Sequence, residues 1–138
     1  MNWDEIPVED VMSTPVRTVE GELAVVEAAR ILCDERIGSV VVQGNEEDGI
    51  LTDTDIVRAV KNGRDPEKTV VTELVSSPVL TTEPDSTLQE AAERMNNHAV
   101  KKLPVVEDGH YVGIVTATDL IGRVSPELDD VVEMFVTD

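Results

Sequence analysis

Two threonine–aspartate pairs are the residues of this 138-residue chain whose types and spacing could do chemistry. Thr52 and Asp55 close residues 49–55, Thr116 and Asp119 close residues 113–119, and five of the seven positions in these stretches are identical. Each stretch is a short apolar run that leads into a segment with helical spacing, which predicts a strand followed directly by a helix. At such a junction the threonine can cap the helix while the aspartate complements the helix dipole. The pattern therefore predicts hydrogen-bonding chemistry, within the protein or toward a ligand.

The similarity between the two halves extends well beyond these pairs. At an offset of 63 residues, the residues Ser13, Pro15, Val16, Thr18 and Glu20 match Ser76, Pro78, Val79, Thr81 and Glu83. From Gly49 and Gly113 onward the offset is 64, so the second copy carries one extra loop residue. A period of about 63 residues exceeds the 20–50 residues of solenoid repeats. We interpret the chain as a duplicated small domain.

Composition limits the classes of partner. Hydrophobic residues make up 41% of the chain but aromatic residues only 2%, so the core must be built from Val, Ile, Leu and Ala. The formal net charge is −18, with 29 acidic and 11 basic residues, and it disfavours binding to nucleic acid and to anionic membranes. Because the carboxylates are spread along the whole chain, we interpret them as adaptation to a salty cytoplasm.

An enzyme is not expected. The sequence has no glycine-rich phosphate loop, no Cys or His cluster for a metal, and too few histidines for a catalytic triad. Cys33 is the single cysteine, and we expect a small buried hydrophobe. No apolar stretch is long enough to cross a bilayer and the N-terminus lacks a signal pattern, so we expect a cytoplasmic protein.

Each copy is expected to form a lead-in helix followed by a β-α-β-β-α unit. The expected elements of the first copy are 5–12, 15–19, 23–35, 39–42, 49–51 and 54–62, and those of the second are 70–75, 78–82, 86–97, 102–106, 111–115 and 117–124. Asp85 or Ser86 can cap the helix over 86–97. Residues 126–136 form a last amphipathic helix, with one stripe made of Leu128, Val131, Val132 and Phe135. This helix has no counterpart after the first copy, so it covers either an exposed face or a partner.

The chain is therefore divided into a first repeat (6–62), a linker (63–69), a second repeat (70–125) and a C-terminal helix (126–138). The fold class is α+β, with α/β-like local order. In each repeat two helices cover one face of a three-stranded sheet and leave the other face bare. Two repeats packed face to face bury both bare faces, which is a physical reason for the duplication.

This order of elements resembles the CBS domain, and the pair resembles a Bateman module. Gly-h-h-Thr-x-x-Asp, where h is apolar, closes each unit, and Ser-x-Pro-Val-x-Thr lies upstream in both copies. The resemblance covers roughly residues 6–125. It implies two repeats related by a pseudo-two-fold axis, with two clefts that commonly take adenosine ligands such as AMP, ADP, ATP or S-adenosylmethionine.

The resemblance also implies roles for individual residues. Asp55 and Asp119 would grip ribose hydroxyls, and Thr52 and Thr116 would lie beside the first phosphate. One carboxylate can accept hydrogen bonds from both hydroxyls of a cis diol, and a helix N-terminus offers free N–H groups to phosphate. The residues expected against the base are Pro15, Val16, Ile37, Gly38, Ser39 and Val40, or Ser77, Pro78, Val79, Val100, Lys101, Lys102, Leu103 and Pro104.

The two clefts are not equivalent in charge. Lys101 and Lys102 stand where the family often places cations that contact phosphate, whereas the first copy has Gly38 and Ser39 there. An exposed pair that relieves acidic repulsion remains the alternative. His98 lacks a second ligand at metal spacing, so we interpret it as a surface or capping histidine.

We therefore expect a stand-alone pair of CBS domains that acts as a regulatory, non-catalytic sensor of an adenosine-containing ligand, with no required cofactor. A homodimer is expected, and a separate effector protein could receive the signal. The competing hypothesis is an interaction module whose clefts stay empty.

The charge balance makes stability depend on salt. Repulsion among the carboxylates opposes the compact state in dilute buffer, whereas the Debye length shrinks to about 3 Å at 1 M salt. We predict that the melting temperature rises steeply between dilute buffer and molar KCl in a thermal scan. A flat curve would contradict the proposed salt adaptation.

Overall fold

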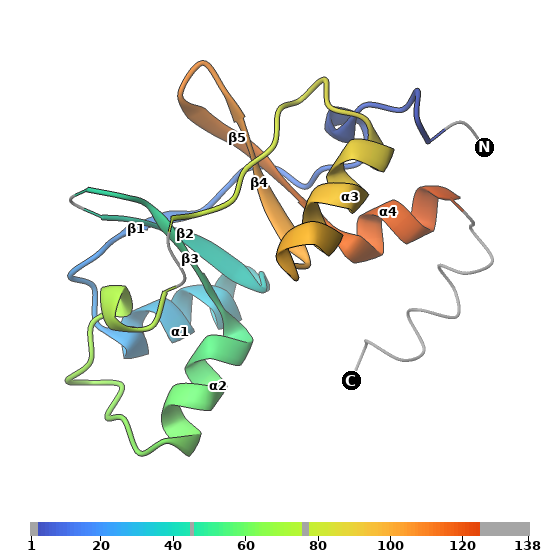
Figure 1. Ribbon diagram of the computed structural model, residues 1–138. Helices are drawn as coiled ribbons and strands as arrows, with labels where there is room; N and C mark the ends of the chain where they lie inside the picture. Colours follow the sequence, from blue (N-terminus) through green and yellow to red (C-terminus); the bar gives the residue numbers. More distant parts are fainter. Residues whose placement is uncertain (1–2, 45, 76–77, 125–138) are drawn as a thin grey trace. The chain divides into compact units, whose positions relative to one another are not determined.

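The computed structural model describes residues 3–44, 46–75 and 78–124, which fall into two compact units (Figure 1). The first-repeat unit is Arg17–Leu80, and the second-repeat unit combines Met1–Val16 with Thr81–Asp138. Helices and small sheets mix in both units, so the predicted α+β class is confirmed.

The first-repeat unit contains a three-stranded sheet of order β1-β2-β3. Its elements are β1 (Thr18–Glu20), α1 (Val25–Glu35), β2 (Ser39–Gln43), β3 (Gly49–Thr52), α2 (Asp53–Lys61) and the 3₁₀ helix η2 (Val71–Glu73). Strand β2 pairs parallel with β1 and antiparallel with β3. Because β2 is the central strand, four of its five residues are buried.

The second-repeat unit is built on a β-hairpin. Its elements are the 3₁₀ helix η1 (Val8–Asp10), α3 (Leu88–His98), β4 (Lys102–Glu107), β5 (His110–Thr116) and α4 (Ala117–Val124). The turn between β4 and β5 places Asp108 and Gly109 at positive φ, 52° and 79°, conformations that Asp and Gly tolerate best. The predicted strand over 78–82 is corrected: among the described residues it is a single parallel bridge between Thr82 and Val105.

Pro104 explains this shortened strand. In the first repeat, the amide of Val41 donates to the carbonyl of Arg17 (3.0 Å) and so extends the pairing of β1. Pro104 occupies the matching position in the second repeat and has no N–H to donate. The pairing is then limited to Thr82, whose N–H and C=O bond Pro104 and Val106 at 3.0 and 2.9 Å.

Helix α1 and helix α3 bury the predicted apolar stripes. Val25, Ala28 and Leu32 are buried in α1, and Leu88, Ala91 and Met95 are buried in α3. The second alanine of each stripe, Ala29 and Ala92, is only half-buried. Helix α1 contacts α2, and α3 contacts α4, so each unit holds a pair of adjacent helices (Figure 1).

Three local expectations need correction. Cys33 is exposed rather than buried, because it lies outside the stripe that ends with Leu32. The cap of α3 is Thr87, whose hydroxyl accepts the amide hydrogen of Glu90, rather than Asp85 or Ser86. The lead-in segments are short 3₁₀ turns, and the C-terminal helix proposed over 126–136 lies outside the described residues.

The first residues of the first sequence repeat, up to Ser13, pack in the second-repeat unit. The amide of Leu88 donates to the carbonyl of Ile6 (2.9 Å), and the amide of Val8 donates to Ser86 (2.8 Å). Ser13 and Ile114 exchange two backbone hydrogen bonds of 2.9 and 3.0 Å. A Cβ at Gly113 would lie 3.1 Å from the carbonyl oxygen of Ser13 and would meet the side chain of Met12, which would have to move.

The linker and the first residues of the second repeat pack in the first-repeat unit in the corresponding way. The amide of Val25 donates to Thr69 (2.8 Å), and that of Val71 donates to Leu23 (2.9 Å). Val8 and Val71 are both 0% exposed, so each lead-in adds a valine to the core of its unit. The sequence repeats (6–62 and 70–125) and the compact units therefore have different boundaries.

Because each lead-in segment packs in the unit of the other repeat, the structure predicts which helix each valine stabilises against local unfolding. Val8→Ala should make α3 easier to open, and Val71→Ala should do the same for α1. Each substitution removes buried apolar surface that contributes about 1.5 kcal/mol of stability. Hydrogen exchange of the helix amides measures the effect. Val57→Ala is the matched control, since Val57 is 67% exposed. Faster exchange in α1 after Val8→Ala, with α3 unchanged, would contradict the packing described here.

Candidate functional site

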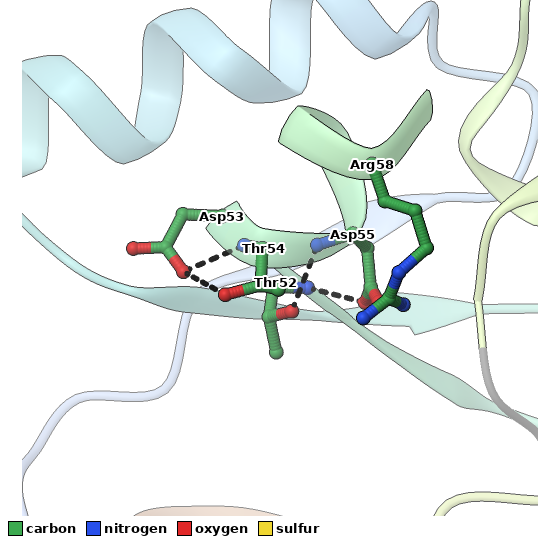
Figure 2. A network of polar contacts seen from close by, with 5 residues as sticks. All are labelled: Thr52, Asp53, Thr54, Asp55 and Arg58. Carbon is green, nitrogen blue, oxygen red and sulfur yellow. Dashed lines mark hydrogen bonds and ion pairs between the residues drawn. The ribbon is translucent and has the colours of Figure 1, made fainter. Parts of the chain in front are cut away.

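The first threonine–aspartate pair lies where β3 becomes α2 (Figure 2). The amide of Thr52 donates to Oδ2 of Asp55 (2.9 Å), and the amide of Asp55 donates to the hydroxyl of Thr52 (3.2 Å). Arg58 reaches the other carboxylate oxygen, with Nη1 3.5 Å from Oδ1. Because Arg58 stands three residues after Asp55, the two side chains lie on the same face of α2.

The second pair reproduces this geometry where β5 becomes α4. The amide of Thr116 donates to Oδ2 of Asp119 (2.9 Å), and the amide of Asp119 donates to the hydroxyl of Thr116 (3.2 Å). Both aspartates are half-buried. Among the described side chains, no contact engages Oδ1 of Asp119. The capping role proposed from the sequence is thus confirmed in both copies, and each carboxylate keeps acceptor capacity beyond it.

The residues before β2 and β4 join the same junctions. The first amide of α2, that of Asp53, donates to Gly38 (3.1 Å), and the first amide of α4, that of Ala117, donates to Lys101 (2.9 Å). In register, Ser39 pairs with Thr52 and Lys102 with Thr116. The structure therefore brings Gly38 and Ser39 beside the first pair, and Lys101 and Lys102 beside the second. The predicted residues Val40, Leu103 and Pro104 are instead buried.

The upstream residues of the predicted clefts belong to other units. Pro15 and Val16 are part of the second-repeat unit, whereas Pro78 and Val79 are part of the first-repeat unit. Pro15 follows a cis peptide bond and is exposed, and the amide of Val79 donates to Asp48 (3.0 Å). Ser77 lies outside the described residues.

Among the described side chains, the cations at the two junctions come from different elements. At the first, Arg58 supplies the positive charge from α2, and the matching position in α4 is Gly122. At the second, exposed Lys101 and half-buried Lys102 supply it from the start of β4. Arg58 was not among the predicted site residues, although its spacing of three residues from Asp55 on a helix indicates that the two side chains can meet.

A separate polar groove of about 970 Å³ lies at the hairpin end of the second-repeat unit. Arg94 and His98 line it together with Glu83, Glu90 and Glu107, and none of the predicted site residues does. His98 ends α3, and its ring Nδ1 lies 3.0 Å from the carbonyl oxygen of Arg94, so its predicted place as a surface or capping residue is confirmed. No group of three metal-ligating side chains occurs within residues 3–44, 46–75 and 78–124.

No helix in the part of the chain that the structure describes combines the length and apolar character needed to cross a membrane.

Comparison with known proteins gives a consistent result. The family model of the CBS domain matches residues 8–62 and again residues 71–126. The CBS domain-containing protein YhcV of Bacillus subtilis is 36% identical over 115 residues, which cover 82% of this chain and 81% of YhcV.

Two solved structures are similar in fold. The CBS domain pair of protein MJ0100, solved with 5′-methylthioadenosine and S-adenosyl-L-methionine, is 30% identical with a TM-score of 0.73, covering 86% of this chain and 94% of that one. The hexameric CBS-CP12 protein from bloom-forming cyanobacteria has a TM-score of 0.80 at 23% identity, covering 93% of this chain and 73% of that one. The second likeness concerns the fold alone.

Proposed function

The chain belongs to the CBS domain family, and from this premise we propose that it is a regulatory, non-catalytic sensor of an adenosine-containing ligand. In this proposal Asp55 and Asp119 accept hydrogen bonds from ribose hydroxyls. The N-termini of the helices that follow Thr52 and Thr116 face the first phosphate or the group that replaces it.

The observation that carries the proposal is that the backbone cap uses one oxygen of each carboxylate, Oδ2. Oδ2 of Asp119 accepts the amide of Thr116, which fixes the orientation of the side chain. A carboxylate has about four acceptor positions, so one backbone hydrogen bond leaves capacity for a diol. Capping and ligand binding are therefore compatible in one residue, and the cap holds the acceptor in place before a ligand arrives.

The charges support a ligand that carries an anionic or polar group. In a chain of net charge −18, Arg58 at one junction and Lys101 and Lys102 at the other are local cations. Phosphate or carboxylate groups would be attracted to them. The methylthioadenosine and S-adenosylmethionine of the MJ0100 domain pair support the adenosine moiety as the common part of the ligand.

The ligand assignment predicts a loss of affinity on removal of the carboxylate. Asp119→Ala should weaken binding at least about ten-fold, because each hydrogen bond to a charged group contributes about 1.5–3 kcal/mol. Calorimetric titration of AMP, ATP and S-adenosylmethionine in molar KCl measures this effect, and Asp55→Ala tests the other junction in the same way.

Glu90→Ala is the matched control. Glu90 closes an equivalent reciprocal cap, accepting the amide of Thr87 at 3.2 Å, but it caps α3 and belongs to neither Thr-x-x-Asp junction. It should lower stability by about 1 kcal/mol without changing affinity. Equal binding by wild type and the Asp55→Ala/Asp119→Ala chain would refute the ribose role. Absence of binding by wild type would favour an interaction module with empty clefts.

A homodimer is the second part of the proposal. Val57 and Val60 lie on α2 and are 67% and 56% exposed, which is unusual for large apolar side chains on one short helix. Association through this helix would cover both valines and transmit a ligand signal between chains or to a separate effector.

The dimer proposal predicts a change in mass on substitution. Val57→Asp/Val60→Asp should shift the particle from two chains to one, because association would then bury unpaired charges. Light scattering in molar KCl measures the mass. Glu67→Ala, an exposed substitution in the linker, should leave it unchanged. One chain per particle for wild type at micromolar concentration would contradict the proposal.

A further inference from the structure

An apolar groove of about 640 Å³ lies along the helices of the second-repeat unit. Helices α3 and α4 lie against each other (Figure 1), and residues from both line the groove. Met95 projects from α3, and Leu120 and Ile121 project from α4. Trp3 closes one side, held by a backbone hydrogen bond of 3.2 Å from Gln89 to its carbonyl. The lining is predominantly apolar, in contrast to the acidic surface expected from the net charge.

Two of the three alanines that line this groove, Ala99 and Ala117, have charged counterparts in the first repeat. Ala99 follows α3 at φ 53°, and its counterpart Arg36 follows α1 at φ 57°. Ala117 is the first residue of α4, and its counterpart Asp53 is the first residue of α2. The two positions have the same backbone in both repeats, yet only the second repeat replaces both charged side chains by methyl groups. At these two positions the second repeat therefore lacks the charges that the first repeat carries on the same backbone.

The chain that follows α4 has a complementary sequence. Residues 125–138 lie outside the described residues, but their sequence places Leu128, Val131, Val132 and Phe135 at helical spacing. They begin directly after Val124, which ends a wall of the groove. A helix over 126–136 would be about 16 Å long, the length of the eleven-residue α3. No such segment follows the first repeat, whose α2 leads into the linker.

We propose that residues 126–136 dock in this groove of their own chain, with the four apolar side chains directed at Trp3, Met95, Leu120 and Ile121. The opposite face of the segment is acidic, and residues 125–138 contain no Lys or Arg. Lys101, exposed at the edge of the groove, is the cation that this acidic face would meet.

The covalent connection favours the same chain over a second copy. A segment joined to the wall by only a few residues has an effective concentration in the millimolar range, well above the micromolar concentration of a separate chain.

Trp3 makes the proposal measurable, because it is the single tryptophan of the chain and lines the groove. In the full chain with Leu128→Ser, Val131→Ser, Val132→Ser and Phe135→Ser, the emission of Trp3 should shift to the red. Its acrylamide quenching constant should rise roughly two-fold or more, because packed side chains no longer cover the ring. The matched control, Asp129→Ser/Asp130→Ser/Glu133→Ser, alters the opposite face of the segment and should retain the protection in molar KCl.

A second variant changes the groove and leaves the segment intact. Ala99→Arg/Ala117→Asp introduces the charged pair of the first repeat on backbone that accommodates it there. It should release Trp3 to the same extent as the serine variant, with unchanged far-ultraviolet circular dichroism. If Trp3 is equally accessible in wild type and the serine variant, the docking proposal is wrong.

Mixing separates the chain's own segment from that of a second copy. A chain with Trp3→Phe and an intact segment is added to the serine variant, which carries the only tryptophan in the mixture. Docking within one chain predicts that quenching of Trp3 stays high. Restored protection would mean that the segment crosses to another chain, which would overturn the proposal.

Discussion

The first amides of every helix need hydrogen-bond acceptors, and this requirement determines much of the arrangement in both units. Helices α2 and α4 meet it with the Thr-x-x-Asp side chains and with the carbonyls of Gly38 and Lys101. Helix α1 begins after Ala24, which offers no side-chain cap, and its amides instead donate to carbonyls of the linker. The Thr-x-x-Asp junctions and the packed lead-in segments thus both supply hydrogen-bond acceptors to the first amides of helices.

Local patterns were predictable because adjacent residues determine them. The strand-to-helix junctions, their reciprocal caps and the apolar stripes of α1 and α3 all depend on neighbours within four residues, which periodicity and capping rules capture. Helical spacing also predicts that Cys33 is exposed, because it lies outside the apolar stripe of α1. The general tendency of cysteine to be buried led to the opposite expectation.

The exchange of lead-in segments was not predictable in this way. It depends on backbone hydrogen bonds between residues far apart in sequence, such as Leu88 with Ile6, and a backbone carbonyl leaves no trace in residue type. The missing strand before Glu83 was predictable only in part. The sequence contains Pro104, but the effect of this proline follows only once β4 is known to pair with that segment. The proposed ligand contacts of the two aspartates would involve groups outside the chain, so only the capping role of these residues follows from the sequence.

The contiguous first-repeat unit and the split second-repeat unit impose an order on biosynthesis. Residues 17–80 include the linker that covers α1, so this unit has all its partners once residue 80 has left the ribosome. The segment up to Val16 is made before this unit, yet the strand and helix it packs against, β5 and α3, are made after it. The N-terminal segment, with apolar Ile6 and Val8, must wait through the synthesis of more than half the chain, and during this interval a chaperone or a neighbouring nascent chain can bind it.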